Sequence, residues 1–412
     1  MKKFKFGVVG AGRGLHIAHY FLLLGCDIVA LCDLELKKNV SETLPCNAKF
    51  YNDFYKFIEH DMDAVILANN FHEHTPFAIE CFKRNIHVFS ECLSNGTMAE
   101  GVQLIREFEK SKSIYMLAEN YPFMTFNREI KRICDNGSLG KIVYAEAEYN
   151  HPSNPNDIQS RKRLHPVKNH WRSYLPKSYY ITHCLAPIMY ATGATPKKVS
   201  AFACFCPPDI NTPTCSFVGD NFASVSTLND DGSIFRVTGN SNFGAPHHST
   251  RVCGKNGQIE NLRGSDDSIL LRYSPWAKPE NMETAEKLYK VELTDKDDFF
   301  IKQAGHAGGD YLAPRAFLDC LKKKEQPSFP FDIYSAVNMS SVAILAHRSV
   351  LNGGMPFDIP DFHNEKERVK FENDQQSPFY HFDGRVPNIP CCSHPEYKPT
   401  KKQIDDFFKK FL

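Results

Sequence analysis

Two phenols and one imidazole lie within five residues of each other at 179–183, in the sequence Tyr-Tyr-Ile-Thr-His. An imidazole can take a proton from a hydroxyl group near neutral pH without a large shift of its pKa. A phenol can deliver a proton to a leaving oxygen when ionic neighbours tune it. His183 is therefore the candidate base, unless it is a core or helix-terminal histidine. Tyr179 and Tyr180 are the candidate acids, and only one of these adjacent residues is expected to face a cleft.

A glycine-rich turn near the amino terminus predicts a dinucleotide site. Gly10 and Gly12 follow an apolar strand and open a helix, which places them in the first two positions of the dinucleotide fingerprint. There the turn must be tight, and the backbone must approach a pyrophosphate. Leu15 occupies the third position and Gly14 stands one place early, so the match is imperfect. A glycine turn that merely closes an α/β unit is the alternative interpretation.

An acidic residue after the second strand strengthens this prediction. Asp33 follows the glycines by about 20 residues, the distance at which a carboxylate binds the adenosine ribose. Leu34 and Glu35 come next. The two carboxylates would repel a 2′-phosphate, which favours NAD over NADP.

The first of three predicted segments, at 1–121, is an NAD-binding domain. Short apolar runs alternate with helical patterns, which is typical of a Rossmann fold, a doubly wound parallel sheet covered on both faces. Ligands bind such a sheet at the carboxyl ends of its strands, and Asn120 and Tyr121 follow the last strand. The predicted strands are at 4–9, 27–32, 63–68, 87–90 and 113–118, with helices at 74–84 and 97–111.

The second segment, at 122–360, is predicted to be an α+β substrate domain. Its longer, alternating strands indicate a large open sheet, mixed or antiparallel, with one exposed face. The predicted strands are at 141–150, 197–205, 221–228, 233–239 and 267–273, and the helices lie near 126–136, 309–323 and 334–351.

The third segment, at 361–412, is a polar tail that ends in an amphipathic helix capped by Thr400. This helix either docks on its own chain or on a neighbouring subunit. The role of the adjacent Cys391 and Cys392 stays open. The apolar face of the helix consists of Ile404, Phe407, Phe408, Phe411 and Leu412.

Both domains resemble the glucose–fructose oxidoreductase / inositol dehydrogenase / MocA family. The resemblance lies in the glycine turn and in the stretches VILANNFHEHTPFAIECFKRNIHVFSECL, SLGKIVYAEAEY and GHAGGDYLAPRAFLDCL. Asn69, Asn70 and His74 stand where the family usually carries Thr, Pro-Asn and His. The resemblance implies NAD as cofactor and a dimer or tetramer. The cofactor-binding residues that we expect from the fingerprint, the resemblance, the strand-end rule and the residue types are Gly10, Gly12, Arg13, Gly14, Leu15, Asp33, Asn69, Asn70, His74, Glu91, Cys92, Asn120 and Trp171.

Two departures from the family pattern point to one branch of it. Glu91-Cys92-Leu93 replaces Glu-Lys-Pro, and YYITHCLAPIMY replaces the usual Asp-x-Gly-x-His segment. Both features resemble the branch of NAD-dependent glycosidases, such as the α-N-acetylgalactosaminidases, which also lacks the lysine. There the resemblance implies a redox-neutral reaction, in which C3 is oxidised, the aglycone is eliminated across C1–C2, water adds, and the ketone is reduced.

The missing lysine leaves a proton donor and a positive charge to be supplied. Cys92 cannot supply the charge, and a small neutral filler is its favoured role. Arg172 could partly replace the lysine as a fixed cation beside an oxyanion. Its neighbour Trp171, one of only two tryptophans, could cover a sugar or the nicotinamide, although a structural tryptophan fits equally well. The expected substrate-binding residues are Tyr121, His170, Thr182, His306 and Asp310.

The composition excludes several classes of partner. A formal net charge of +1 gives no basic surface for nucleic acid or an anionic membrane, and no apolar run is long enough to cross a bilayer. The 14 cysteines are scattered without metal-ligand spacing, which favours reduced thiols in the cytoplasm. His247-His248 lacks a third ligand at a suitable spacing, so we expect no metal.

Three functions are compatible with these patterns. The leading one is an NAD-dependent oxidoreductase that acts on a hydroxyl group, expected at C3, of a sugar or glycoside, with His183 as base. The first alternative is the redox-neutral glycosidase. The second is a non-catalytic NAD-binding sensor, because a lost lysine is what degeneration would produce. All three require a dinucleotide on the first domain, and the two enzymes also require the reactive ring beside His183.

Overall fold

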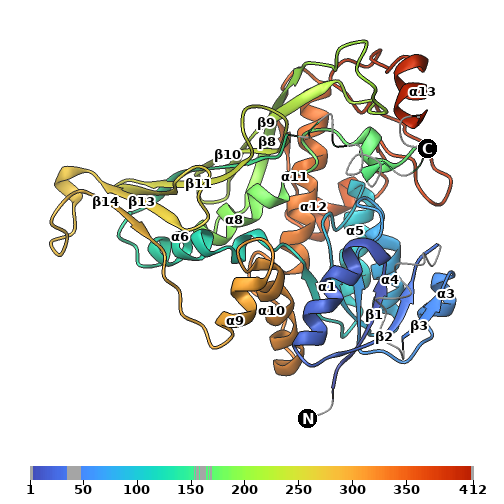
Figure 1. Cartoon of the computed structure of the whole chain (residues 1–412), viewed down its shortest axis with the longest axis horizontal. Coiled ribbons are helices and arrows are strands. Elements are labelled where there is room, and N and C mark those ends of the chain that lie inside the picture. Colours follow the sequence, from blue (N-terminus) through green and yellow to red (C-terminus); the bar gives the residue numbers. More distant parts are fainter. Residues whose placement is uncertain are drawn as a thin grey trace. The chain divides into compact units, whose positions relative to one another are not determined.

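The computed structural model describes residues 3–34, 48–152, 154, 157, 164, 165, 167 and 169–409. The chain forms two compact units (Figure 1). Unit 1 comprises Met1–Met124, Thr294–Ser340 and Phe362–Gln375, and unit 2 comprises Thr125–Leu293, Ser341–Asp361 and Gln376–Leu412. Among the described residues, the helices are too short or too polar to span a membrane.

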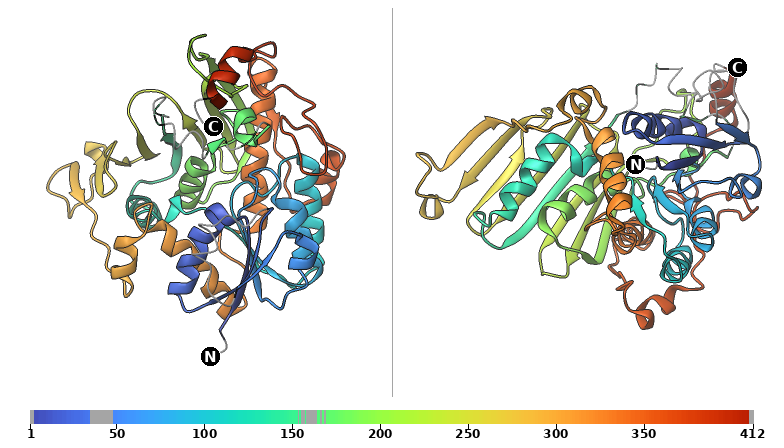
Figure 2. Two further views of the ribbon diagram at one scale, coloured as in Figure 1. Left: turned by 45° about the vertical axis from the view of Figure 1, so that its right-hand side comes forward. Right: turned by 90° about the horizontal axis from the view of Figure 1, so that it is seen from below.

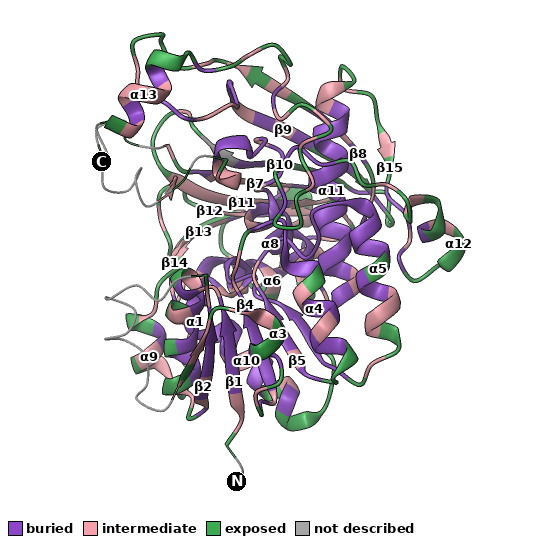
Figure 3. Cartoon of the chain, turned by 90° about the vertical axis from the view of Figure 1, so that its right-hand side faces the viewer, coloured by how far each residue is buried: buried purple, intermediate pink, exposed green. Residues whose placement is uncertain are grey.

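Unit 1 contains a six-stranded parallel sheet with the order β3-β2-β1-β4-β5-β6. The central strands are almost wholly buried because helices cover both faces (Figure 3). This confirms the predicted doubly wound domain. Strand β3, which is short and partly exposed at the sheet edge, was not predicted. The strands are β1 (Lys5–Val9), β2 (Asp27–Cys32), β3 (Lys49–Tyr51), β4 (Ala64–Leu67), β5 (His87–Ser90) and β6 (Tyr115–Leu117).

The helices of unit 1 come from distant parts of the sequence. Helix α5 begins with a capping box. The Thr97 side chain accepts a hydrogen bond from the Glu100 amide, and the Glu100 side chain accepts one from the Thr97 amide. These helices are α1 (Ala11–Leu23), α3 (Phe54–Phe57), α4 (His74–Lys83), α5 (Met98–Glu109), α9 (Asp298–Gln303), α10 (Gly309–Lys323) and α12 (Glu365–Arg368), with the 3₁₀ turns η1 (Tyr121–Phe123) and η4 (Val369–Phe371).

The place of α10 differs from the predicted domain boundaries. This helix was predicted to belong to the second domain, whereas the structure includes it in unit 1. The reason is aromatic packing: the ring of Phe317 lies 5.2 Å from Phe89 and 6.3 Å from both Phe6 and Phe21. Helix α10 therefore completes the core beside the six-stranded sheet. The long helix α11 (Ile333–Leu351) contributes residues to both units.

Unit 2 contains a nine-stranded sheet with the order β14-β13-β12-β11-β7-β10-β9-β8-β15. Only the β7–β10 pair among these described neighbours is parallel, which confirms the predicted mixed sheet. Helices α6 and α8 cover one face (Figure 2). The elements are α6 (Thr125–Asp135), β7 (Ile142–Asn150), η2 (Trp171–Tyr174), α8 (Thr182–Thr192), β8 (Pro196–Phe205), β9 (Asp220–Asn229), β10 (Ile234–Ser241), β11 (His247–Gly254), β12 (Gly257–Asn261), β13 (Ser268–Tyr273), η3 (Pro275–Ala277), β14 (Glu286–Lys290) and β15 (Phe357–Asp358).

The predicted tail divides between the two units instead of forming a separate segment. Its last described helix, α13 (Lys401–Lys409), belongs to unit 2 and packs on its own chain there. Gln403 donates to the carbonyls of Asp209 and Thr212 at 3.2 Å, and Phe407 is 1% exposed against Cys215. Glu35, Phe411 and Leu412 lie outside the described residues. The 13 described cysteines are all free thiols.

Candidate active site

The glycine turn has the geometry that a bound dinucleotide requires. Gly10 has a φ of +91°, and a side chain there would collide with the carbonyl of Ala68. Gly12 is exposed, and a Cβ at this position would meet open space. Gly14 is buried, and its added Cβ would lie 2.6 Å from Val8 Cγ1. Gly14 thus allows the close helix–strand packing that the third fingerprint glycine usually provides, one position earlier than expected.

Asp33 lies at the carboxyl end of β2, beside the glycine turn. One carboxylate oxygen accepts a hydrogen bond of 2.7 Å from the Ala11 amide, and the other accepts one of 2.7 Å from the Leu34 amide. The first of these bonds satisfies an amide at the start of α1, which has no partner within the helix. Asp33 therefore anchors the glycine turn, and its negative charge lies where a ribose would bind.

Asn69, Asn70 and His74 form the corner between β4 and α4. Asn69 donates 3.0 Å to the Glu73 carbonyl, and Asn70 donates 2.7 Å to the Glu73 carboxylate. The Asn69 Oδ1 atom is buried and has no hydrogen-bond partner in the part of the chain that the structure describes. His74 is fully buried, with Nδ1 at 2.6 Å from the Leu93 carbonyl, and burial lowers its pKa. The unpartnered Asn69 oxygen and the open Gly12 both fit a dinucleotide at this edge.

Arg13 links the glycine turn to two carboxylates. Its Nε atom donates 2.8 Å to Glu91, at the carboxyl end of β5, and an Nη atom donates 2.7 Å to Asp310, at the start of α10. Glu91 directly follows β5, and it occupies the position of the glutamate in the Glu-Lys-Pro sequence of the family that the chain resembles. The neighbouring Cys92 is 6% exposed, and its role as a small neutral filler stays a prediction. Arg13 consequently places a fixed positive charge at the same sheet edge from which the lysine is missing.

Asp310 is the centre of a hydrogen-bond network in unit 1. Its Oδ1 also accepts 2.6 Å from Asn120 Nδ2, and its Oδ2 lies 2.9 Å from His306 Nδ1 and 3.2 Å from His16 Nε2. Although burial alone would raise the pKa of this carboxyl, hydrogen bonds from the two histidines and Arg13 hold it far below its usual range. The Asp310 side chain is only 2% exposed, so it orders its neighbours.

This network combines residues that were predicted to bind different ligands. Arg13, Glu91 and Asn120 were expected to bind the cofactor, whereas His306 and Asp310 were expected to bind substrate. The Tyr121 ring, also expected to bind substrate, is buried 5.5 Å from the His306 ring. Direct substrate contact by these last three residues stays a prediction. His16 was not predicted, although its position on α1 one turn after Arg13 could have suggested it.

Unit 2 gathers a second group of chemically competent side chains around His183. This residue lies in the first turn of α8, and its ring is 4.8 Å from the Tyr180 ring and 5.2 Å from the Tyr149 ring. Tyr149 in turn stacks on His248, at 5.3 Å and 11°, because the two residues are direct partners in the β7–β11 ladder. Neither Tyr149 nor His248 was predicted. Only the strand register shows that they face the start of α8.

The two candidate tyrosine acids have different surroundings. Tyr180 contacts both His183 and Tyr149, whose rings lie 4.8 and 5.9 Å away. Tyr179 is 0% exposed, with its ring 5.3 Å from Phe379 and 5.7 Å from His347. As expected of adjacent residues, they point to different sides. Tyr180 is the tyrosine that the structure brings to His183.

Close backbone packing holds this corner of unit 2. Gly239 in β10 lies against the Tyr180 carbonyl, and any side chain at this position would collide with it. Thr182 begins α8, is 1% exposed, and its Oγ1 has no hydrogen-bond partner among the described residues. Contact of this hydroxyl with substrate stays a prediction.

The upstream cluster at 170–172 forms a stacked unit. The Arg172 guanidinium lies 4.3 Å above the Trp171 ring, and the His170 ring is 5.5 Å from Trp171. Burial and the charge of Arg172 lower the pKa of His170 to about 4, so this imidazole is neutral near pH 7. A guanidinium over an indole face offers an aromatic ring and hydrogen-bond donors, both of which suit contact with sugars.

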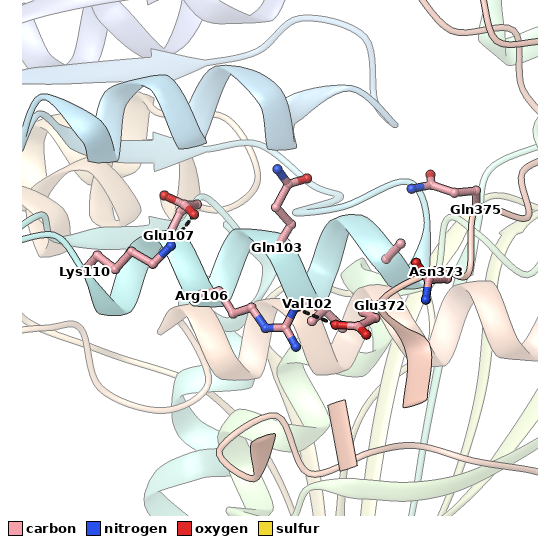
Figure 4. Close-up of a pocket in the computed structure, with 9 residues that line it drawn as sticks. Val102, Gln103, Arg106, Glu107, Lys110, Glu372, Asn373 and Gln375 are labelled. Atoms are coloured by element: carbon pink, nitrogen blue, oxygen red, sulfur yellow. Dashed lines mark hydrogen bonds and ion pairs between the residues drawn. The ribbon is translucent and has the colours of Figure 1, made fainter. Parts of the chain in front are cut away.

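A surface hollow of about 380 Å³ lies along α5 in unit 1 (Figure 4). Its charged side chains already pair with each other. Arg106 contacts Glu365 and lies 2.8 Å from Glu372, and Lys110 lies 2.6 Å from Glu107. None of the predicted site residues lines it, so it is not the candidate active site.

The fold defines a class: a parallel sheet of the Rossmann type in unit 1, and an α+β unit with a nine-stranded mixed sheet in unit 2. Residues 217–368 match the family "Glycosyl hydrolase 109, C-terminal domain". The chain is 23% identical to a glycosyl hydrolase family 109 protein of Shewanella woodyi, over 86% of this chain and 84% of the relative. It is also 23% identical to an alpha-N-acetylgalactosaminidase of Tannerella forsythia, over 87% and 86%. These relatives confirm the resemblance to the glycosidase branch.

Solved structures share the fold at lower identity. Levoglucosan dehydrogenase in complex with NADH and levoglucosan is 13% identical, with a TM-score of 0.68 over 87% of this chain and 100% of the other. An oxidoreductase of Agrobacterium radiobacter in complex with NAD+, L-tartaric acid and magnesium is 14% identical, with a TM-score of 0.67 over 87% and 98%. At these identities the similarity establishes the fold alone, which agrees with the predicted fold class.

Proposed function

We propose that the chain is an NAD-dependent glycosidase that oxidises its sugar transiently and returns it to the original oxidation state. The observation that supports this proposal most directly is that His183 contacts two phenols, Tyr180 and Tyr149, in unit 2. Oxidation of one hydroxyl needs a single base, whereas elimination also needs a base for the C2 proton and an acid for the leaving oxygen. Three proton-transfer groups match the longer reaction. The similarity to family 109 proteins supports the same choice.

Unit 1 supplies the residues that would hold NAD. Gly10 and Gly12 would cradle the pyrophosphate at the start of α1, and Asp33 would bind the adenosine ribose. Bound NAD would accept a hydride from the sugar and later give it back. Arg13, held by Glu91 and Asp310, supports the proposal because it keeps a positive charge at this sheet edge without the family's lysine.

The residues of unit 2 would handle the protons. His183 removes the hydroxyl proton at the oxidised carbon, which we place at C3. The resulting ketone makes the C2 proton acidic, so that one tyrosine, as the phenolate, can remove it. The other tyrosine protonates the glycosidic oxygen as the C1–O bond breaks. Water then adds across C1–C2, with its hydroxyl group at C1 and a proton, delivered by the tyrosine that removed the first one, at C2. The sets Tyr149–Tyr180 and Trp171–Arg172 would bind the sugar between flat, polar-edged surfaces.

A plain NAD-dependent sugar dehydrogenase is the second candidate. The fold similarity to levoglucosan dehydrogenase favours it. It would use His183 in the same way and release NADH. In both cases we expect a sugar or glycoside as the small-molecule partner. A cytoplasmic location and a dimer or tetramer remain predictions from the sequence.

One incubation separates these possibilities. The protein is mixed with NAD and a panel of 4-nitrophenyl glycosides, including N-acetyl-α-galactosaminide, in deuterated water. Release of nitrophenol with deuterium at C2 and no accumulation of NADH is the expected result. NADH without nitrophenol would identify a dehydrogenase. Tight NAD binding without any turnover on a broad panel would identify the sensor and overturn the proposal.

A further inference from the structure

The stretch at 376–393, here called the C-terminal strap, packs on the part of unit 2 that carries Trp171, Arg172 and Tyr180. It closes on itself first: the Ser377 amide donates 2.8 Å to Asn388 Oδ1, and the Asn388 amide donates 3.0 Å to the Ser377 carbonyl. His381 Nε2 lies 2.8 Å from Ser377 Oγ. These bonds give the strap a defined shape, although it has no regular secondary structure.

Two neighbouring aromatic residues of the strap contact the site segment. The Phe379 ring is 0% exposed and meets the Tyr179 ring edge-on, at 5.3 Å and 88°. The Tyr380 ring meets Tyr174 at 5.1 Å and 67°. Tyr174 is stacked on its other side by Phe217, at 4.8 Å and 9°. The strap thus contacts Tyr174 and Tyr179, which are the two ends of the segment 174–179.

Hydrogen bonds fix the other end of the strap to the same region. The carbonyl of Pro390 lies 2.7 Å from His347 Nε2, and the His347 ring packs against Tyr179. Cys391 Sγ donates 3.5 Å to the Phe217 carbonyl, and the Phe217 amide donates 2.7 Å to the Ser173 carbonyl. Beyond Cys392, the Ser393 amide donates 2.9 Å to Asp220. The contacts of Pro390 and Cys391 are thus made with His347, which packs against Tyr179, and with Phe217, which is bonded to Ser173 in η2.

The two tyrosines that the strap contacts lie next to, or within three positions of, the proposed active-site residues. Tyr174 follows Trp171 and Arg172 by two or three positions, and Tyr179 immediately precedes Tyr180. Moving Tyr174 or Tyr179 would therefore move the stacked pair and the phenol beside His183. Since a displacement of about 1 Å can lower a catalytic rate about 100-fold, such anchors matter for turnover.

We propose that the C-terminal strap is a positioning element of the active site, and that Phe379 and Tyr380 act through Tyr179 and Tyr174 on Tyr180 and Trp171. The proposal rests on the function proposed above. Because the proposed function gives Trp171 to the sugar and not to the nicotinamide, the strap is expected to affect turnover by unit 2 and to leave NAD binding by unit 1 unchanged.

The test exploits the presence of only two tryptophans. Trp276 is 86% exposed, and Trp276→Phe leaves Trp171 as the single fluorescent reporter of the segment. In this background, Tyr380→Ala removes one anchor, Tyr380→Phe keeps its ring, and Phe382→Ala removes a 74% exposed aromatic side chain of the same strap as a matched control. Emission of Trp171, kcat on the best nitrophenyl glycoside, and Kd for NAD are measured for each full-length variant.

Tyr380→Ala is expected to shift the Trp171 emission and to lower kcat at least about tenfold, with the Kd for NAD changed less than about twofold. Tyr380→Phe should restore both, and Phe382→Ala should match the parent. If Tyr380→Ala fails to fold, Tyr380→Leu takes its place with the same expectations. An unchanged emission, or an unchanged kcat despite shifted emission, overturns the proposal. If the parent protein acts on no glycoside or sugar, the proposed function fails, and the emission alone decides whether the strap holds the segment.

Discussion

Arg13 and Asp310 are 297 residues apart in the sequence and share a hydrogen bond of 2.7 Å in unit 1. The bond joins the first turn of α1, where the dinucleotide would bind, to the first turn of α10. Glu91 holds the same guanidinium from the end of β5. The cofactor loop is therefore positioned by two carboxylates that come from distant parts of the sequence.

Asp310→Asn should loosen this loop. The change removes the negative charge that Arg13, Asn120 and the two histidines share, and leaves Arg13 with Glu91 alone. Breaking a buried ion pair from one side costs roughly 3 kcal/mol. We expect a lower melting temperature and about tenfold weaker NAD binding in titration calorimetry. Asp319→Asn, on the exposed side of α10, is the control and should leave both unchanged. Equal NAD affinity in the two variants would remove Asp310 from the site.

Phenylalanine substitutions should separate the two adjacent tyrosines. Tyr180→Phe removes a hydroxyl group beside His183, and we expect kcat to fall by a factor of about 100 to 10,000 with little change in stability. Tyr179→Phe changes a side chain buried against Phe379 and His347, so kcat should stay within about threefold. Steady-state kinetics on the preferred glycoside give both values. A greater loss from Tyr179→Phe than from Tyr180→Phe would contradict the assignment.

Asp33 should govern the choice between NAD and NADP. Its carboxylate is fixed by the amides of Ala11 and Leu34, so it cannot swing away from a 2′-phosphate. The wild-type protein is expected to bind NAD at least about tenfold more tightly than NADP, a difference of about 1.4 kcal/mol. Asp33→Ala should weaken NAD binding and abolish this preference, as measured by titrating both coenzymes. Tighter binding of NADP by the wild-type protein would show that the carboxylate does not contact the ribose.

His347 should make unit 2 sensitive to mild acid. Burial lowers the pKa of this imidazole from 6.5 to about 4, so the unfolded chain binds a proton between these pH values that the folded chain does not. Stability therefore falls as the pH drops from 6.5 to 4, by up to about 3 kcal/mol from this residue. Asp310, whose pKa is lowered, adds its own loss of stability only below its usual pKa of 3.8.

Urea denaturation at about pH 7 and about pH 4.5, on either side of most of this transition, measures the effect. His347→Gln keeps a donor for the Pro390 carbonyl and removes the titrating ring. The variant should lose clearly less stability than the wild type between the two pH values. Equal losses in the two proteins would show that His347 does not cause the acid sensitivity.

Residues at strand ends could be predicted from the sequence because their position follows from local patterns. Apolar strands, the glycine turn and Asp33 predicted the sheet edge at which a dinucleotide would bind, and the sequence at 179–183 pointed to His183 and its neighbouring tyrosines. Tyr149 could not be found in this way. It occupies the inward side of an alternating strand, and its neighbour His248 reaches it only through the pairing of β7 with β11.

The predicted domain boundaries failed for a similar reason. The patterns of α10 and α11 show amphipathic or apolar helices, but not which sheet their apolar faces cover. Phe317 packs with Phe6, Phe21 and Phe89, and only long-range contacts contain this information. The same limit applies to Asp310: the sequence places it near the start of a late helix, but it does not show the contacts of its carboxylate with Arg13, Asn120 and the two histidines.

The return of the chain to unit 1 at Thr294 has a consequence for synthesis on the ribosome. When β1 and β5 have emerged, the helix that shields Phe6 and Phe89 has not yet been translated, and it is complete only at Lys323. The nascent amino-terminal half therefore carries an uncovered aromatic face while more than 200 further residues are added. Chaperones that bind exposed aromatic side chains should engage this nascent chain until α10 arrives, and an expression fragment that stops at residue 121 should aggregate.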